Sequence, residues 1–402
     1  MSTAGHIFVH GIGAVSPAGW GELPLREALA EGEPLPVKEI ARPGWTRSLR
    51  VRPVRPPSPR PSFLAHARLR RTSPITQYAV TAALEALGED AARVNNGSLR
   101  LGIIFCVMTG CVNYSRRFYD ETLKDPATAS PLVFPETVFN APASHLAALL
   151  GTSAINYTLV GDPGTFLQGL ALAADWLLNG RVNACLVIGA EEIDWLTTDA
   201  YRLFARNIIL SAGAGALYLR RSEQPTPCPS QEGRRHSETS VQFPSCPPSL
   251  RFGAVAPKPT AKAEEGSGVG LAASMVMTES GAITTVRLDS ITESHLFLEG
   301  RTRAEAALGM RAELPVGTAE HLLCDGTQGL RHLDDAELEA WRGWPGSRLS
   351  PKRVLGEGLA AASAWQCVAA VDALRQGQYP AATVSVEGCN QQAIGAHFCS
   401  TA

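Results

Sequence analysis

The chain has 402 residues, of which 45% are hydrophobic and 18% are charged. This length suffices for two packed domains or for one large body built from two similar halves. The formal net charge of -2 gives no global reason to expect nucleic acid or an acidic membrane surface as a partner. Only a local patch of charge could bind a charged partner.

Nine cysteines are scattered along the chain. An odd number without regular spacing is typical of reduced thiols in a cytosol, so disulfides are not expected. Cys106 and Cys111 lack a second Cys or His pair at zinc-like spacing, which favours a buried pair over a metal site. The N-terminus lacks the features of a secretory signal, and no apolar stretch reaches the roughly 18 residues of a membrane span. The sequence therefore predicts a cytoplasmic protein without a cofactor, a metal or a membrane span.

Short β-branched runs alternate with longer runs rich in alanine and leucine, which is the pattern of strands joined by helices. In the expected helix that starts at Phe166, apolar residues recur at three- and four-residue spacing, which predicts one buried face. The fold class is therefore predicted to be α/β. The expected strands are Ile7–Val9, Leu101–Phe105, Asn156–Val160 and Ala184–Gly189, and the expected helices are Thr76–Leu87 and Phe166–Asn179.

Two segments interrupt this pattern. Arg42–Arg71 is rich in proline and arginine, which predicts an exposed, extended arm rather than a packed element. The arm is either a solvated loop or a basic docking surface for an acidic partner. Arg221–Glu265 is too polar to bury and is predicted to be a disordered insertion. The predicted organisation is thus 1–220, 221–265 and 266–402. The arginines that would form the docking surface are Arg47, Arg50, Arg52 and Arg55.

Several separate segments resemble the β-ketoacyl synthases, in the order in which that family carries them. Ile7–Gly19 resembles the opening strand and glycine turn, Arg70–Leu87 the next helix, and Pro135–Leu150 the segment that leads to the dimer interface and the active site. Ala184–Glu191 is similar to the strand that ends in Gly-x-Glu, and Ser211–Leu217 to the family's glycine-rich turn. The resemblance implies a thiolase-like fold in which two similar βα halves form a layered αβαβα body.

The family's active site holds a cysteine and two histidines, and this sequence carries carboxylates at the matching positions. The cysteine normally opens a helix whose N-terminus lowers the pKa of the thiol, and Asp162 stands at that corner. The first histidine matches Asp325, and the second matches Glu357. The closing glycine-rich loop is reduced to a single glycine within Ser385–Asn390.

These replacements change the expected chemistry. A carboxylate cannot take up an acyl chain as a thiol does, and ionised carboxylates would repel the enolate that the histidines stabilise. Asp162 also has a structural interpretation, as an N-cap with Pro163 at the first helical position. Cys324, the one thiol expected near the site, is interpreted as a packed residue. His145 and His321 are interpreted as structural or solvated histidines.

Two functional hypotheses follow from the resemblance. The first is a non-catalytic subunit, similar to chain-length factors, which pairs with an active ketosynthase and works with an acyl carrier protein; a homodimer is the alternative assembly. The second is an enzyme with altered chemistry on acyl thioesters. In it, Asp162, Asp325 and Glu357 would converge, and their repulsion would raise at least one pKa for acid-base work or allow a divalent cation to bind. Decay of a once-active 3-oxoacyl-[acyl-carrier-protein] synthase is a third possibility.

Overall fold

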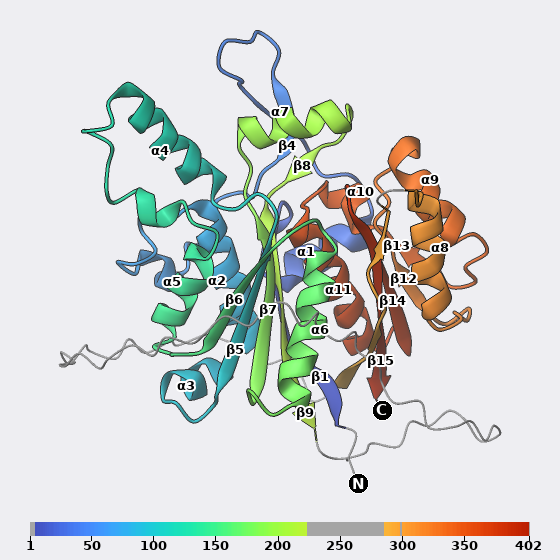
Figure 1. Cartoon of the computed structure of the whole chain (residues 1–402). Coiled ribbons are helices and arrows are strands. Elements are labelled where there is room, and N and C mark those ends of the chain that lie inside the picture. The colour runs from blue at the N-terminus through green and yellow to red at the C-terminus, as the bar shows by residue number, and fades with distance from the viewer. Residues whose placement is uncertain (1–4, 223–284, 298–299, 402) are drawn as a thin grey trace. The chain divides into compact units, whose positions relative to one another are not determined.

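The structure is a computed structural model and describes residues 5–222, 285–297 and 300–401. Within these ranges, twelve strands form one sheet in the order β13-β12-β14-β15-β10-β1-β9-β7-β5-β6, with β2 beside β1 and β11 beside β15 (Figure 1). The antiparallel pair of β1 and β10 joins the N-terminal half of this sheet to the C-terminal half. The strands are β1 (His6–Ser16), β2 (Gly19–Trp20), β5 (Leu101–Val107), β6 (Ile155–Val160), β7 (Ala184–Glu191), β9 (Gly213–Ser222), β10 (Thr285–Ile291), β11 (His295–Leu296), β12 (Leu322–Cys324), β13 (Ser347–Leu349), β14 (Ala381–Glu387) and β15 (Gln392–Thr401).

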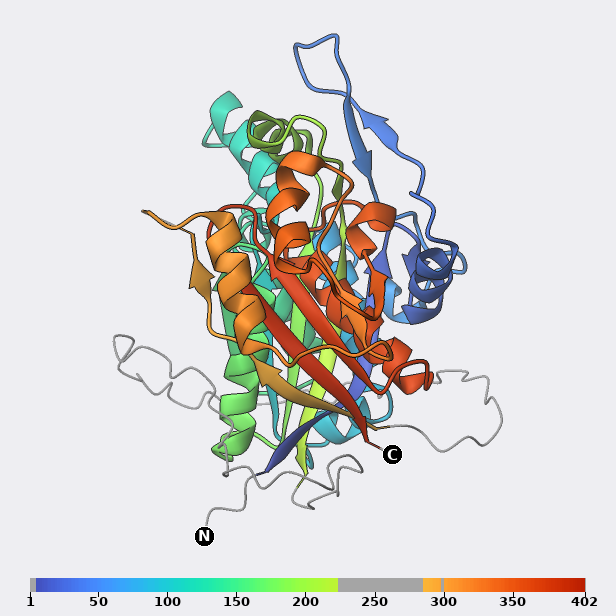
Figure 2. The ribbon, with the colours of Figure 1, turned by 90° about the vertical axis from the view of Figure 1, so that its right-hand side faces the viewer.

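The helices cover both faces of the sheet in layers. Helices α6 and α11 lie between the two halves of the sheet, α2 and α5 cover the outer face of the N-terminal half, and α8 and α9 cover the outer face of the C-terminal half (Figures 1 and 2). The helices are α1 (Glu22–Glu31), α2 (Pro74–Leu87), α3 (Asp90–Asn95), α4 (Val112–Lys124), α5 (Ala141–Leu149), α6 (Thr165–Leu178), α7 (Trp195–Phe204), α8 (Arg303–Glu313), α9 (Arg331–Ala340), α10 (Pro351–Leu355) and α11 (Ala360–Arg375), with short 3-10 turns η1 (Ser62–Ala65) and η2 (Phe134–Glu136).

The alternation of side chains along β5 explains this layering. Ile104 and Cys106 pack with the middle helices, whereas Ile103 and Phe105 pack with α2 and α5. Successive side chains of a strand point to opposite faces, so a strand that is covered on both faces reads as one continuous apolar run. The middle helix α11 is enclosed in the same way, because every residue from Ala360 to Leu374 is buried.

The structure confirms the predicted α/β class and the layered arrangement. Each predicted strand and helix is present, and the ends differ by a few residues: the strand predicted at Ile7–Val9, for example, runs from His6 to Ser16. The helix predicted from Phe166 is α6, and Leu167, Leu170 and Ala174 are buried on it. None of the described helices has the length and apolar character that crossing a membrane requires.

The prediction that 42–71 is an exposed arm throughout is wrong for part of the segment. Leu49–Arg52 forms strand β4, which pairs with β3 (Lys38–Ile40) and in parallel with β8 (Leu210–Ser211). Val51 is fully buried, and Leu64 and Leu69 are buried farther along. These apolar residues, spaced among the prolines and arginines, pack against the rest of the fold and fix the segment to it.

The predicted boundary between 220 and 221 is also shifted. Strand β9 continues through Arg221 and Ser222, which pair with the start of β1. Backbone pairing with β1 overrides the polar character of these two side chains. The rest of the predicted insertion, 223–265, and the stretch 266–284 lie outside the described residues.

Candidate functional site

Asp162 lies at the corner between β6 and α6. Its side chain is buried, Oδ1 accepts hydrogen bonds from Gln392 Nε2 at 2.8 Å and from the Gly164 backbone N–H at 3.1 Å, and Oδ2 accepts one from the Gln392 backbone N–H at 3.3 Å. The N-cap of α6 is Gly164, so the interpretation of Asp162 as the N-cap is wrong. Most of the carboxylate's bonds go to Gln392, at the start of β15.

The surroundings of Asp162 are closely packed. Burial raises the pKa of Asp162, and the hydrogen bonds from Gln392 and Gly164 partly oppose this shift. A Cβ atom added at Gly388 would overlap the Oδ2 atom of Asp162. The glycine that remains in the closing loop therefore makes room for this carboxylate.

Asp325 directly follows β12, whose last residue is Cys324. Its Oδ1 atom accepts hydrogen bonds from Ser350 Oγ at 2.6 Å, Thr327 Oγ1 at 2.8 Å and the Thr327 backbone N–H at 3.2 Å. The side chain is 2% exposed. Asp325 thus ties the turn after β12 to the start of α10.

Glu357 lies between α10 and α11 and forms a buried ion pair. Its Oε2 atom is 2.9 Å from Lys352 Nζ and accepts a hydrogen bond from Gln328 Nε2 at 2.8 Å. Its Oε1 atom accepts from the Leu359 backbone N–H at 2.7 Å. The backbone of Glu357 also bonds with Ile209 and Ser211 next to β8. Both carboxylate oxygens of Glu357 are therefore engaged.

Sequence reasoning missed a further acid beneath this region. Glu337 on α9 accepts the backbone N–H of Gly326 at 3.0 Å and the hydroxyl of Ser385 at 2.5 Å. Burial, followed by the negative charges of Asp325 and Glu387, raises the pKa of Glu337. Glu337 is one of several acidic residues on α9, which also carries Asp334, Asp335 and Glu339. The local sequence does not single it out, because the loop and the strand that bury it come from elsewhere in the chain.

A second missed residue is Cys389, in the loop that follows β14. The prediction that Cys324 is the one thiol near the site is wrong, because the negative charges of both Asp162 and Glu357 act on the Cys389 thiol. The thiol lies 3.8 Å from Met108 Sδ. Burial, with these charges, raises its pKa to about 11. Cys324 is fully buried in β12, as the packed interpretation expected.

The three predicted carboxylates are not grouped as closely as the ligands of a metal ion would be. Among the described residues, the atoms of Asp289, His397 and Cys399 form a group in which all ligand atoms lie within 4.8 Å of one another, and Asp162, Asp325 and Glu357 form no such group. The raised pKa of Asp162 comes first from burial. Each of the three carboxylates accepts hydrogen bonds from different partners.

The remaining predicted residues are accounted for by packing. Cys106 and Cys111 are buried. His145 Nε2 lies 2.7 Å from Glu136 Oε1, and His321 is half-buried before β12. Within the described part of the chain, no hydrogen bond joins any of these four residues to Asp162, Asp325 or Glu357.

Comparison of the sequence with models of protein families gives no match, and comparison with curated proteins gives no significant match. Comparison of the structure gives many. The ishigamide ketosynthase/chain length factor has a TM-score of 0.69 at 17% identity, over 99% of this chain and 100% of that chain. A β-ketoacyl synthase from Burkholderia phymatum STM815 has a TM-score of 0.70 at 15% identity, over 99% and 100%.

A third similar structure is the AntDE:AntF complex of a type II polyketide ketosynthase with its acyl-carrier protein. Its TM-score is 0.66 at 13% identity, over 99% of both chains. At such low identity the likeness concerns the fold. It spans 99% of this chain in each of the three cases. The chain therefore has the thiolase-like fold of the β-ketoacyl synthases.

Proposed function

We propose that this chain is a non-catalytic ketosynthase-like subunit, similar in role to a chain-length factor, that pairs with an active ketosynthase in fatty-acid- or polyketide-type biosynthesis. The observation that carries the proposal is the state of Asp162, Asp325 and Glu357. Each is buried, and each accepts hydrogen bonds from its own chain. Carboxylates held in this way stabilise loops, and they offer an acyl thioester neither a thiolate nor a proton donor.

The raised pKa of Cys389 supports the same proposal. The thiolate is the form of cysteine that attacks a thioester. With a pKa of about 11, the Cys389 thiol stays protonated near neutral pH. The partly accessible thiol of Cys389 is thus a poor substitute for the nucleophile that the fold normally carries.

Strand β6 supports the pairing with a second chain. It is one edge of the sheet, and Tyr157 and Val160 on it are 47% and 55% exposed. An edge strand with exposed apolar side chains is suited to pair with another chain. Leu132 and Phe134, shortly before α5, are exposed as well, and α5 packs on β6. We infer that the partner docks along β6, which leads directly to the corner at Asp162.

A cavity of about 620 Å³ between β4 and α7 supports binding of an acidic carrier protein. Its lining includes Arg47, Arg50, Arg202 and Arg206 and no acidic residue. Such a surface attracts an acidic partner electrostatically. Arg52, which the sequence placed in this docking surface, does not belong to it. Its side chain is buried and donates a hydrogen bond to the Leu35 carbonyl oxygen. Two arginines from α7 and its following loop, distant in sequence, complete the surface.

Co-purification with each ketosynthase encoded near this chain, read by native mass spectrometry, tests the pairing. A stable one-to-one complex is the expected result. Replacing Tyr157 and Val160 with lysine should abolish the complex, whereas Leu338→Lys, at an exposed leucine on α9, should not. A monomer or self-dimer that ignores these synthases would refute the proposed role. Activity on acyl thioesters that disappears in Asp162→Asn would favour the enzyme hypothesis instead.

The carrier-protein surface has its own test. Replacing Arg47, Arg50 and Arg206 with serine should weaken the affinity of the assembled complex for the carrier protein, increasingly so at low salt. Arg68 and Arg70 provide a matched control, since both are exposed arginines of the same 42–71 segment and neither lines the cavity. Equal losses in the two sets would show that only general positive charge matters.

A further inference from the structure

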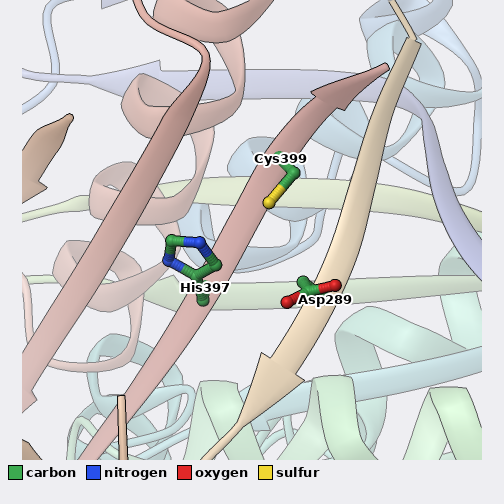
Figure 3. A group of neighbouring side chains, drawn as sticks. All are labelled: Asp289, His397 and Cys399. Atoms are coloured by element: carbon green, nitrogen blue, oxygen red, sulfur yellow. The ribbon is translucent and has the colours of Figure 1, made fainter. Parts of the chain in front are cut away.

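Three potential metal ligands meet on one face of the β10–β15 pair. His397 and Cys399 are two residues apart on β15, so their side chains point to the same face. The register between the strands shifts between Leu288 and Ser290 on β10, and Asp289 sits at this bulge. Figure 3 shows the three side chains gathered beside the two strands. One ligand atom from each lies within 4.8 Å of the other two.

His397 is buried and is held in place by a second residue. It is 4% exposed. The Nδ1 atom lies 3.1 Å from Thr383 Oγ1, so Nε2 remains for an ion. A second hydrogen-bonded group of this kind commonly orients a histidine that binds a metal.

Asp289 and Cys399 form the solvent side of the group. Both are partly exposed, whereas His397 is buried, so an ion can enter from the Asp289 and Cys399 side. Arg287 Nη2 donates a hydrogen bond to Asp289 Oδ1. This contact holds the carboxylate in place and leaves Oδ2 for an ion. The guanidinium of Arg287 is also a nearby positive charge, which repels a bound cation. The negative charges of the metal ligands have to offset this repulsion.

We propose that Asp289, His397 and Cys399 bind a zinc ion that ties the C-terminal strand β15 to β10. A carboxylate, an imidazole and a thiolate together suit zinc, whereas calcium and magnesium prefer oxygen ligands alone. Binding releases the Cys399 thiol proton, so the two negative ligands neutralise the ion. The three ligand atoms must move toward one another by roughly 1 Å, so that each lies about 2.0–2.3 Å from a tetrahedral zinc ion. A fourth position remains for water or an added ligand.

The test is a zinc titration of the whole reduced chain, followed by isothermal calorimetry and by metal analysis after dialysis. One zinc ion per chain is expected. Asp289→Ala and Cys399→Ser should each weaken binding by more than about 100-fold, and Thr383→Val, which leaves the three ligands in place, by about 10-fold. Cobalt(II) should give a thiolate charge-transfer absorption that Cys399→Ser removes. The far-ultraviolet circular dichroism of each variant shows whether it is folded.

Matched thiol variants separate this site from the other cysteines. Cys389→Ser and the double change Cys228→Ser/Cys246→Ser should leave both the zinc stoichiometry and the cobalt absorption unchanged. The proposal is overturned if the folded wild-type chain binds no zinc, or if binding survives Cys399→Ser and disappears in either control. Because the readout is metal binding, the result does not depend on whether the chain pairs with a ketosynthase.

Discussion

The ammonium group of Lys352 lies 2.9 Å from Glu357 Oε2, and both side chains are 3% exposed. Burial by itself lowers the pKa of Lys352, but the charge and hydrogen bond of Glu357, with the charge of Glu337, outweigh it and raise that pKa. Glu357 stands where the resemblance expects a histidine. In this structure Glu357 is half of an internal ion pair.

Breaking this ion pair should destabilise the protein. Glu357→Gln leaves the Lys352 charge buried without its counter-ion, which typically costs about 3–5 kcal/mol of unfolding free energy. Urea unfolding followed by tryptophan fluorescence measures the change. The double variant Lys352→Met/Glu357→Gln should recover most of it. Arg342→Gln, in an exposed pair with Glu339, is the control and should have little effect. A small loss in Glu357→Gln would mean that water solvates Lys352.

The stability should depend on pH through Glu191, at the end of β7. Burial raises its pKa to about 7, against hydrogen bonds from Thr109 and Met108. The pKa of Glu191 is higher in the folded state than in the unfolded state. Its contribution to the free energy of unfolding is therefore fully present below about pH 4.5 and is lost as the pH rises through 7. The wild type should therefore lose about 2.5 kcal/mol between pH 5 and pH 8 relative to Glu191→Gln. Parallel pH profiles of the two proteins would contradict this.

Cys389 should react slowly with alkylating reagents. With its pKa at about 11, labelling at pH 8 should be about 100-fold slower than that of free cysteine, since the thiolate is the reacting form. Peptide mass spectrometry gives the rate at this residue alone. Asp162→Asn removes one of the negative charges that raise the pKa and should speed the labelling. A rate like that of free cysteine would restore Cys389 as a possible nucleophile.

The contact between Gly388 and Asp162 gives a steric prediction. A Cβ at position 388 would overlap Asp162 Oδ2, so Gly388→Ala should cost about 1–3 kcal/mol of stability, as overpacked sites do. Asp162→Ala removes the overlapping oxygen. The double variant should therefore be less destabilised than the sum of the two single changes. Additive losses in thermal unfolding would show that the loop moves aside on its own.

Much of the fold could be predicted from local pattern. The run Leu101–Phe105 is apolar at every position because β5 is covered on both faces, and that pattern does not depend on which elements cover it. The sequence also predicted a strand-to-helix corner at Asp162, and the structure has this residue between β6 and α6. Each of these predictions uses residues that are close together in the sequence.

The tertiary structure alone decided which groups these residues contact. Asp162 is held by Gln392, 230 residues away, and β4 is packed because β8 supplies a partner strand. Asp289 meets His397 and Cys399 only through the pairing of β10 with β15 and the bulge between them. Such contacts depend on strand register and on burial by distant segments. A sequence specifies them only through the packing of the whole chain, so no local pattern reveals them.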